Sequence, residues 1–331
     1  MGLFGVVRDG VARVNRAPAI LAGVWLLTLV VSLPLAIALR SQIATHLGDS
    51  MTANRVADGV DYEWMQEFTD QASGVGVTLT PRIIGFAAVL DNASAFLDNT
   101  SRPVLIIGAA AAYIGLWIFL AGGIIDRFAR DRAVGSPAFF SACGTFFFRF
   151  LRLALVQALV YGFLFGPLHG WLFDRLYPRM IHDVTVERTA FLARVALYVV
   201  FGVLVAAANV VFDYAKVRAV VEDRRSMVGA ISSALGFIER NYAAAVGVYL
   251  INFCVFLLAV GAYASIAPGV EHGALVWIAF AIAQCYVVAR LWVKLLFWAS
   301  ETALFQSRLA HAGYVARPLP AWPDSPAASA I

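Results

Sequence analysis

Six long apolar runs dominate this sequence, at roughly residues 18–39, 103–125, 149–173, 190–212, 243–267 and 274–296. The apolar core of a bilayer needs about 20 residues of helix, and lipid offers no partner to an unpaired peptide group. Runs of this length must therefore be helical if they cross a membrane. The composition agrees, because 61% of the residues are hydrophobic and only 14% are charged, against about 25% charged in soluble domains. The sequence predicts an all-α polytopic membrane protein with six transmembrane helices.

The distribution of arginine and lysine orients these helices. If both ends of the chain are inside, the segments on the inner side carry 17 of the 25 basic residues. Basic loops stay on the cytoplasmic side of a membrane, so we expect both termini in the cytoplasm. The net charge of +4 belongs to this signal, so nucleic acid is not an expected partner. Lysine occurs only at Lys216 and Lys294, a bias toward arginine that suits a GC-rich bacterial genome, and we expect the bacterial inner membrane.

The segments around the runs define the predicted domain organisation. Residues 1–17 place apolar side chains at helical spacing between arginines, which predicts an interfacial helix. Residues 18–312 form the six-helix membrane domain, and residues 40–102 within it predict a helical cap on the outer surface. Residues 313–331 are rich in proline and are predicted to be disordered. Ala36-Ile-Ala38 resembles a signal-peptide cleavage site, but the first run is full length, so we expect it to be retained as a span.

One pattern recurs along the chain: an apolar run ends in an aspartate, a basic strip follows, and a capped amphipathic helix leads to the next run. It occurs at Gly122–Arg132 and at Asn209–Ser226, and an altered copy at Tyr286–Lys294 has arginine in place of aspartate. Ser136 and Ser226 can cap the two amphipathic helices. We predict repeated helix–elbow–helix units, offset by about ninety residues, with two amphipathic elbow helices at the cytoplasmic interface.

Small residues in the third run predict close helix packing. Gly162, Gly166 and Gly170 recur at four-residue spacing, which allows two helix backbones to approach each other. Between them, His169 is expected to be a hydrogen-bonded packing residue, with a proton-handling role as the alternative.

Sequence motifs for catalysis are missing. The chain has no G-x-S-x-G nucleophile elbow, no H-E-x-x-H zinc motif and no phosphate-binding P-loop. Its three cysteines lie in apolar or amphipathic stretches without the spacing of metal ligands or of a disulfide framework. We therefore expect no enzymatic activity, no catalytic residue, no metal and no cofactor.

Four ionisable side chains lie near the inner ends of the even-numbered runs and form a candidate polar cluster: Asp126, Asp213, Arg290 and Lys294. Ionisable groups at this depth are costly unless they are paired or hydrated. One hypothesis is that Arg290 bridges one or both aspartates and pins the repeat units together. The other is that the cluster forms a polar vestibule for an ion or a lipid headgroup.

The stretch Phe212–Arg225, with its elbow helix, resembles multi-pass bacterial membrane proteins whose activity is uncharacterised. It is also similar to the membrane domain attached to some glycerophosphodiester phosphodiesterases. The likeness covers about the last two-thirds of the chain. It implies a helical membrane domain and carries over no catalytic residue, because the phosphodiesterase catalytic domain has no counterpart here. The outer cap departs from the pattern of that domain.

These observations leave two functions open. The first is a non-enzymatic scaffold or accessory subunit that binds membrane lipids or a membrane protein partner, including a second copy of the chain. The second is a transporter or lipid-translocating protein that uses the polar cluster on the cytoplasmic side. A continuous cavity that reaches the cluster would favour the second function. A tightly packed bundle with a large apolar side patch would favour the first.

Overall fold

A computed structural model of the protein describes residues 2–48, 50–59, 61–80, 82, 85–100, 104–269 and 274–309. All regular secondary structure in these ranges is helical, which confirms the predicted all-α class. The predicted disordered tail, residues 313–331, lies outside the described residues.

Six helical segments are long and apolar enough to cross a membrane, and each contains one of the predicted runs. The helices that form them are α2 (Pro18–Leu47), α6 (Val104–Arg130), α7 (Ser136–Phe163), α9 (Glu187–Val221), α11 (Tyr242–Ile266) and α12 (Leu275–Arg308). The chain is thus a multi-pass membrane protein by length and composition of its helices. Several helices extend beyond their apolar run because no helix-breaking residue follows the run directly. For example, α2 continues until Gly48, whose φ of +50° lies in the left-handed region that glycine adopts readily.

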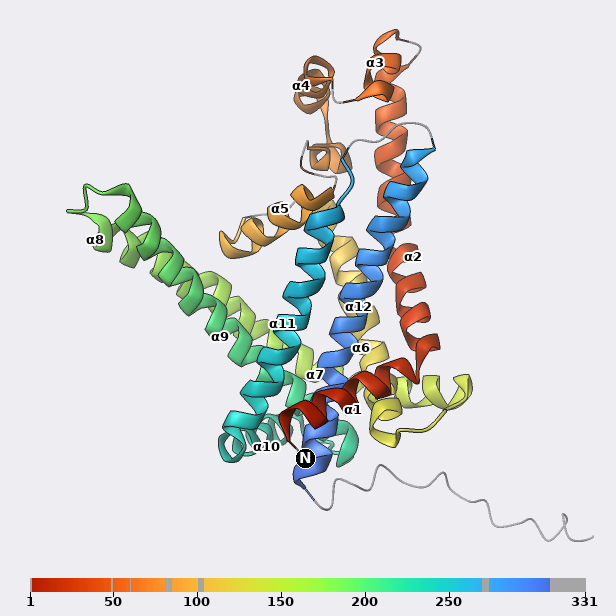
Figure 1. The fold of residues 1–331 in the computed structure, drawn as a ribbon, viewed down its shortest axis with the longest axis vertical. Helices are drawn as coiled ribbons and strands as arrows, with labels where there is room; N and C mark the ends of the chain where they lie inside the picture. Colours follow the sequence, from red (N-terminus) through yellow and green to blue (C-terminus); the bar gives the residue numbers. More distant parts are fainter. Residues whose placement is uncertain are drawn as a thin grey trace, which may run out of the picture.

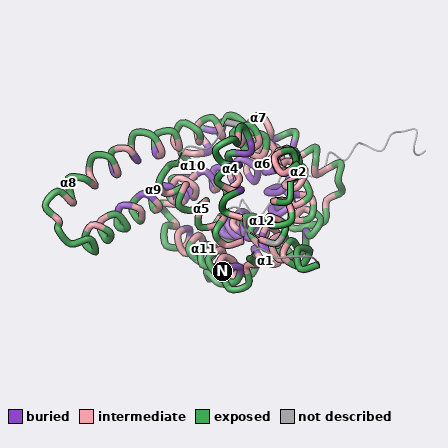
Figure 2. The backbone as a smooth tube through the Cα atoms, turned by 90° about the horizontal axis from the view of Figure 1, so that it is seen from above, coloured by how far each residue is buried: buried purple, intermediate pink, exposed green. Residues whose placement is uncertain are grey.

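The spans form a bundle with a side arm (Figure 1). Helices α2, α6, α11 and α12 run along the long axis, whereas the outer half of α7 and the start of α9 leave them as a hairpin. The hairpin turns through two π-helical stretches, η2 (Leu164–Leu168) and η3 (Trp171–Leu176), and the short helix α8 (Tyr177–Ile181). We call this hairpin, residues 160–205, the arm. Figure 2 shows buried residues gathered in the bundle and few of them along the arm.

The arm has a small core of its own, formed between its two helices by Leu164, Leu172, Leu197, Phe201 and Val205. This arrangement explains why the predicted glycine stripe does not pack. Gly162 and Gly166 lie on an exposed face of α7, and a Cβ built on either would meet no atom within 4 Å. Gly170 has only the carboxylate of Asp174, on the next turn, within 4 Å. The larger apolar side chains on the opposite face of this part of the arm pack against α9. The glycine stripe therefore makes no helix contact within the described chain.

Close helix packing occurs instead between α6 and α7. A Cβ on Gly122 would lie 2.7 Å from Cβ of Phe146, and a Cβ on Gly123 would lie 2.9 Å from the Phe139 carbonyl oxygen. These two glycines let the backbones of α6 and α7 approach closely. His169 is buried in the arm, and its Nε2 lies 2.8 Å from the Leu97 carbonyl oxygen, as expected for a packing residue.

Two amphipathic helices cross the end of the bundle that lies at the bottom of Figure 1, which we call the inner end. They are α1 (Leu3–Asn15) and α10 (Met227–Arg240). The predicted interfacial helix at residues 1–17 is a packed part of the fold. Val6 and Val14 are buried, and Gly10 lies against Ser300 of α12. The guanidinium of the buried Arg13 donates to the Phe128 carbonyl oxygen at 2.8 Å and to Gln306 at 2.7 Å. The apolar face of α1 therefore covers protein rather than lipid.

The inner end of α12 is the centre of this packing. Every residue from Trp298 to Phe305 is buried, which is the pattern of a helix enclosed on all sides. Helix α12 packs against α1, α2, α6, α9 and α11. It continues beyond the last apolar run through Gln306 to Arg308.

The two predicted elbow helices differ. The second is the separate helix α10, which Ser226 caps by accepting from the Gly229 amide, and it ends where Asn241 leaves helical geometry. The first elbow and the third span form one continuous helix, α7. No glycine or proline stands between Phe146 and Arg152 to break it, so the expected bend is absent.

The inner ends of α6 and α9 share a geometry. Each is followed by an aspartate with positive φ, Asp131 (47°) and Asp223 (51°). Each of these carboxylates accepts from an arginine of another inner helix segment, Arg16 at 2.7 Å and Arg149 at 2.6 Å. The two predicted repeat units therefore end in the same kind of turn.

The cap lies at the other end of the bundle, at the top of Figure 1. It consists of α3 (Thr52–Asp58), α4 (Tyr62–Gln71), the 3₁₀ turn η1 (Gly74–Thr78) and α5 (Gly85–Leu97). Trp64 and Phe68 of α4 are buried against His46 of α2, and the Trp64 indole donates to the imidazole at 3.0 Å. The described part of residues 40–102 is thus helical, as predicted, although residues 40–47 belong to α2.

Candidate functional site

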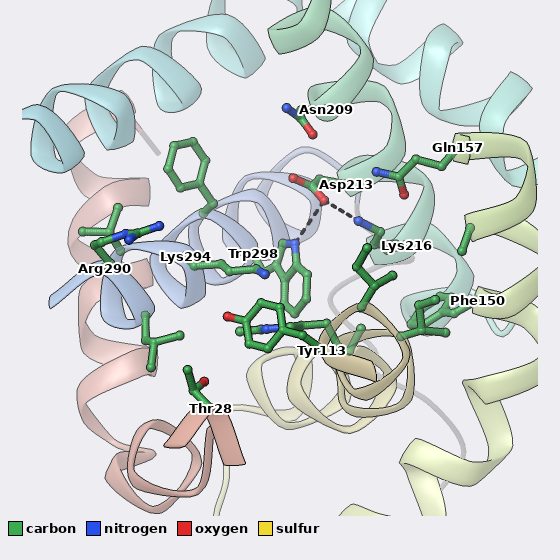
Figure 3. A pocket seen from close by; sticks show the side chains of 18 of the residues that line it. Thr28, Tyr113, Phe150, Gln157, Asn209, Asp213, Lys216, Arg290, Lys294 and Trp298 are labelled. Carbon is green, nitrogen blue, oxygen red and sulfur yellow. Dashed lines mark hydrogen bonds and ion pairs between the residues drawn. The ribbon is translucent and has the colours of Figure 1, made fainter. Parts of the chain in front are cut away.

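A cavity of about 790 Å³ lies between the spans toward the inner end (Figure 3). All six spanning segments contribute to its wall. Its size falls within the range of about 300–1,000 Å³ that is typical of small-molecule sites. Much of the lining is aromatic or aliphatic, and it includes Tyr113, Ile114, Phe256, Val287 and Phe297.

One face of α12 supplies the charged part of the wall. Arg290, Lys294 and Trp298 follow one another at four-residue spacing, so they share one side of the helix. Figure 3 shows this row with Asp213 and Lys216 of α9 across from its Trp298 end. The row is possible because α12 continues as a straight helix past the apolar run, which carries Trp298 beneath the cavity.

Asp213 makes two contacts, both through one carboxylate oxygen. Its Oδ1 accepts from Nζ of Lys216 at 2.8 Å and from the Trp298 indole at 3.1 Å. The two charged side chains are only 16% and 17% exposed, so this ion pair is largely shielded from solvent. The indole contact ties α9 to α12. Asp213 is thus a pin between helices, but its partners are Lys216 and Trp298 rather than the predicted Arg290.

Lys294 has aromatic rings rather than a carboxylate beside it. Its Nζ lies 3.4 Å from the centroid of the Trp117 ring and 5.7 Å from that of Tyr113. A cation over an aromatic face is stabilised by about 0.5–2 kcal/mol, which does not neutralise its charge. No hydrogen bond or ion pair joins Lys294 to any side chain that the structure describes.

Arg290, one turn farther out, is in a similar position. Its guanidinium carbon lies 5.7 Å from the centroid of the Tyr286 ring, and Tyr286 in turn stacks on Tyr263 at 4.1 Å. Within the described ranges no carboxylate pairs with Arg290, so it does not bridge the aspartates. The cavity wall therefore holds three basic side chains and one acidic side chain, and of the three only Lys216 is paired with the acid.

Asp126 does not belong to this group. It is buried in the packed inner end of α6, where it pairs with Arg130 of its own helix at 2.7 Å. It does not line the cavity. Of the four residues in the predicted cluster, the structure brings Asp213, Arg290 and Lys294 together and leaves Asp126 apart. The reason is rotational, because Asp126 and the cavity-lining residues of α6, such as Trp117 and Ala121, leave the helix in different directions.

Neutral polar groups complete the wall. The hydroxyl of Tyr161 donates to Oδ1 of Asn209, which joins the two helices of the arm at its base. Gln157 lies nearby on α7. Trp117 is buried, and its Nε1 has no hydrogen-bond partner among the described residues.

Glu301 is a second polar residue that sequence reasoning missed. It lies seven residues beyond Lys294 on the same side of α12, below the cavity. Its side chain is buried, and neither carboxylate oxygen has a hydrogen-bond partner in the part of the chain that is described. The only sequence signal is its position within a helix that extends past the apolar run.

Neither a metal site nor a similarity to known proteins identifies the function of the cavity. Among the described residues, no group of three or more His, Cys, Asp or Glu side chains could hold a metal ion. Comparison of the chain with models of known protein families, with curated proteins and with solved structures finds no match.

Proposed function

We propose that this protein is a non-enzymatic membrane protein that takes a lipid or a similar amphiphile into its internal cavity and moves it within the membrane. The observation that carries the proposal is the cavity itself. It combines a charged inner wall at Asp213, Lys216 and Lys294 with apolar walls at Ile114, Phe256 and Val287. This is the combination that the two ends of an amphiphile require.

The cavity favours a lipid-translocating protein over a purely structural scaffold. A scaffold needs surfaces rather than an internal space, and a packed bundle would serve it better. The space here reaches Asp213 and Arg290 of the predicted cluster, although it does not reach Asp126. Membrane lipids are accordingly the partners that we propose, and a protein partner or a second copy of the chain is not required.

We further infer that the protein lies in the bacterial inner membrane with both termini in the cytoplasm. The support is the concentration of basic residues at the end of the bundle that holds α1 and α10. We also infer that the α6 and α9 units are an internal repeat. The matching turns at Asp131 and Asp223, each bound to an arginine, support this inference.

Filling the cavity tests the proposal. Ala154 and Ala158 of α7 line the cavity, so Ala154→Trp and Ala158→Trp would occupy it with an indole. Ala207→Trp is the matched control, since Ala207 is exposed on α9 and outside the cavity lining. Native mass spectrometry from nanodiscs should find retained lipid on the wild type and the control. Loss of that lipid from both cavity variants, with the fold intact by circular dichroism, is expected.

Translocation is measured separately. In proteoliposomes, the wild type and Ala207→Trp should accelerate the movement of fluorescent lipid between leaflets, and the filled variants should not. Retained lipid without such movement would leave a lipid-binding scaffold as the better description. Equal lipid retention by the filled variants and the control would rule out the cavity as the binding site.

A further inference from the structure

We propose that the cavity selects an anionic phospholipid, whose phosphate is held by Lys294 and Arg290. This inference rests on the proposed function, because it assumes that the cavity binds an amphiphile. It adds the charge of the headgroup and the residues that recognise it.

The first step is the charge of the wall. Lys216 and Asp213 form an ion pair at 2.8 Å, and the same carboxylate oxygen accepts from Trp298. Neither contact of Asp213 involves Lys294 or Arg290. These two basic side chains line the cavity without a hydrogen bond or an ion pair to any described carboxylate.

The second step is the cost of leaving these charges as they are. Cations inside a membrane protein are expensive unless an anion or water accompanies them. The rings of Trp117 and Tyr286 face the two cations and stabilise them in part, but rings cannot cancel a net charge. Every other charged lining residue is already paired. A negatively charged ligand is the partner that the lining lacks.

The third step is the identity of the anion. Arginine and lysine one turn apart suit the several oxygens of a phosphate group, since arginine binds two oxygens at once and lysine acts as a point charge. A free phosphate ion would not use the apolar lining at Phe256 and Val287, whereas the acyl chain of a phospholipid would.

The chain offers a direct chemical probe of this site. Its only two lysines, Lys216 and Lys294, both line the cavity. An amine-reactive reagent followed by peptide mass spectrometry therefore reads out the cavity in the unmodified protein. Phosphatidylglycerol vesicles should slow the labelling of Lys294, and phosphatidylcholine vesicles should not. Protection by inorganic phosphate alone, equal to that by phosphatidylglycerol, would overturn the lipid assignment.

Charge-removing variants test the residues. In nanodiscs with equal phosphatidylglycerol and phosphatidylcholine, native mass spectrometry should show preferential retention of phosphatidylglycerol by the wild type. Arg290→Gln and Lys294→Gln should each reduce that preference, by about tenfold if each charge contributes as a typical charge-assisted hydrogen bond does. Arg152→Gln and Arg225→Gln are the matched controls, because both arginines are exposed and outside the cavity lining. Their preference should stay at the wild-type value.

The outcomes separate this inference from the proposed function. Equal retention of the two lipids by the wild type, abolished in Ala158→Trp, would overturn the charge assignment and leave the lipid-binding cavity standing. No retained lipid from either class would remove both. A preference that falls as much in Arg225→Gln as in Lys294→Gln would assign the anionic lipid to the protein surface and overturn the inference.

Discussion

Asp213 carries both an ion pair and an inter-helix hydrogen bond, so its replacement separates two effects. Asp213→Asn removes the charge that neutralises Lys216 but keeps an oxygen that can accept from Trp298. Leaving the lysine unpaired should lower the free energy of unfolding by about 1–3 kcal/mol. Asp213→Ala should cost more, since it also loses the contact with α12. Thermal unfolding in detergent measures the stability of both variants. Unchanged stability would mean that Asp213 does not act as a pin between α9 and α12.

A double variant provides the control for that prediction. Asp213→Asn with Lys216→Gln contains no unpaired charge from this ion pair, and should therefore be more stable than Asp213→Asn alone. If the double variant is instead the less stable of the two, Lys216 has another stabilising partner and the ion pair is not the source of the effect.

Glu301 should respond in the opposite direction to Asp213. Its carboxyl group is buried without a hydrogen-bond partner among the described residues. Glu301→Gln keeps the shape of the side chain and has no charge to bury, so the melting temperature should stay unchanged or rise. Glu301→Lys should prevent folding, because it would place a longer, cationic side chain in a position that is already fully buried. A marked loss of stability in Glu301→Gln would mean that the carboxylate has a partner in the membrane.

At the scale of elements, glycines with the same helical setting should behave differently. Gly122 and Gly123 face α7 so closely that even a methyl group would clash. Gly123→Ala should cost about 1–3 kcal/mol through overpacking. Gly162→Ala, in open space on α7, should be neutral or stabilise by up to about 1 kcal/mol through helix propensity. Melting temperatures in one detergent compare them, and equal effects would refute the α6–α7 contact.

A polar latch joins the end of α5 in the cap to the arm. The carboxylate of Asp98 accepts from Arg194 at 2.9 Å and from the hydroxyl of Tyr198, both on α9. The next residue, Asn99, donates to the Phe165 carbonyl oxygen at 2.8 Å, within the π-helical stretch η2. The latch thus joins the cap to both sides of the arm hairpin.

The latch should depend on pH. The hydrogen bond from Tyr198 is the main cause that lowers the pKa of Asp98 below its ordinary value of 3.8, and Ser94 and Arg194 act in the same direction. A lowered pKa in the folded state means that the contact stabilises above pH 3.8 and is lost as the pH falls through the lowered value. Asp98→Asn should open the latch at neutral pH, which hydrogen exchange of α5 would detect. After correction for the intrinsic pH dependence of amide exchange, the protection of α5 in the wild type should fall as the pH drops through the lowered pKa of Asp98, whereas protection in the variant should not.

The spans could be predicted from the sequence because hydropathy depends on each run alone. The splay of the arm could not, since it depends on which faces meet. Leu164 and Leu172 face α9, whereas Gly162 and Gly166, which looked like packing residues, face away. The continuous helix α7 was missed because an amphipathic segment and an apolar run look separate in sequence, although nothing between Phe146 and Arg152 breaks the helix.

Part of the candidate site could also be predicted from the sequence. Asp213, Arg290 and Lys294 stood out because ionisable residues near the end of an apolar run are unusual. Asp126 met the same criterion, yet the rotation of α6 leaves it outside the cavity lining. Trp117 and Trp298 gave no warning, because aromatic residues are common in spans and only the meeting of three helices makes them walls. Sequence patterns therefore identified charge, and the assembly decided which charges face one another.

At the scale of the whole molecule, the two ends of the bundle are built differently, and this difference predicts their sides of the membrane. The inner end holds α1, α10 and most basic residues, whereas the cap at the opposite end carries several acidic side chains. The positive-inside rule places the first end in the cytoplasm. In a variant whose three cysteines are replaced, Gln66→Cys in α4 and Ala133→Cys between α6 and α7 provide exposed labels on opposite ends.

A maleimide that cannot cross the membrane should label Gln66→Cys in spheroplasts, in which the outer membrane and periplasm no longer hinder access. It should label Ala133→Cys only after the membrane is permeabilised, because the positive-inside rule places that loop in the cytoplasm. In this orientation the cavity lies nearer the cytoplasmic leaflet. An amphiphile from that leaflet would then meet Lys294 and Arg290 with its headgroup. Labelling of Ala133→Cys in intact spheroplasts would reverse the topology, and an amphiphile would then enter the cavity from the outer leaflet instead.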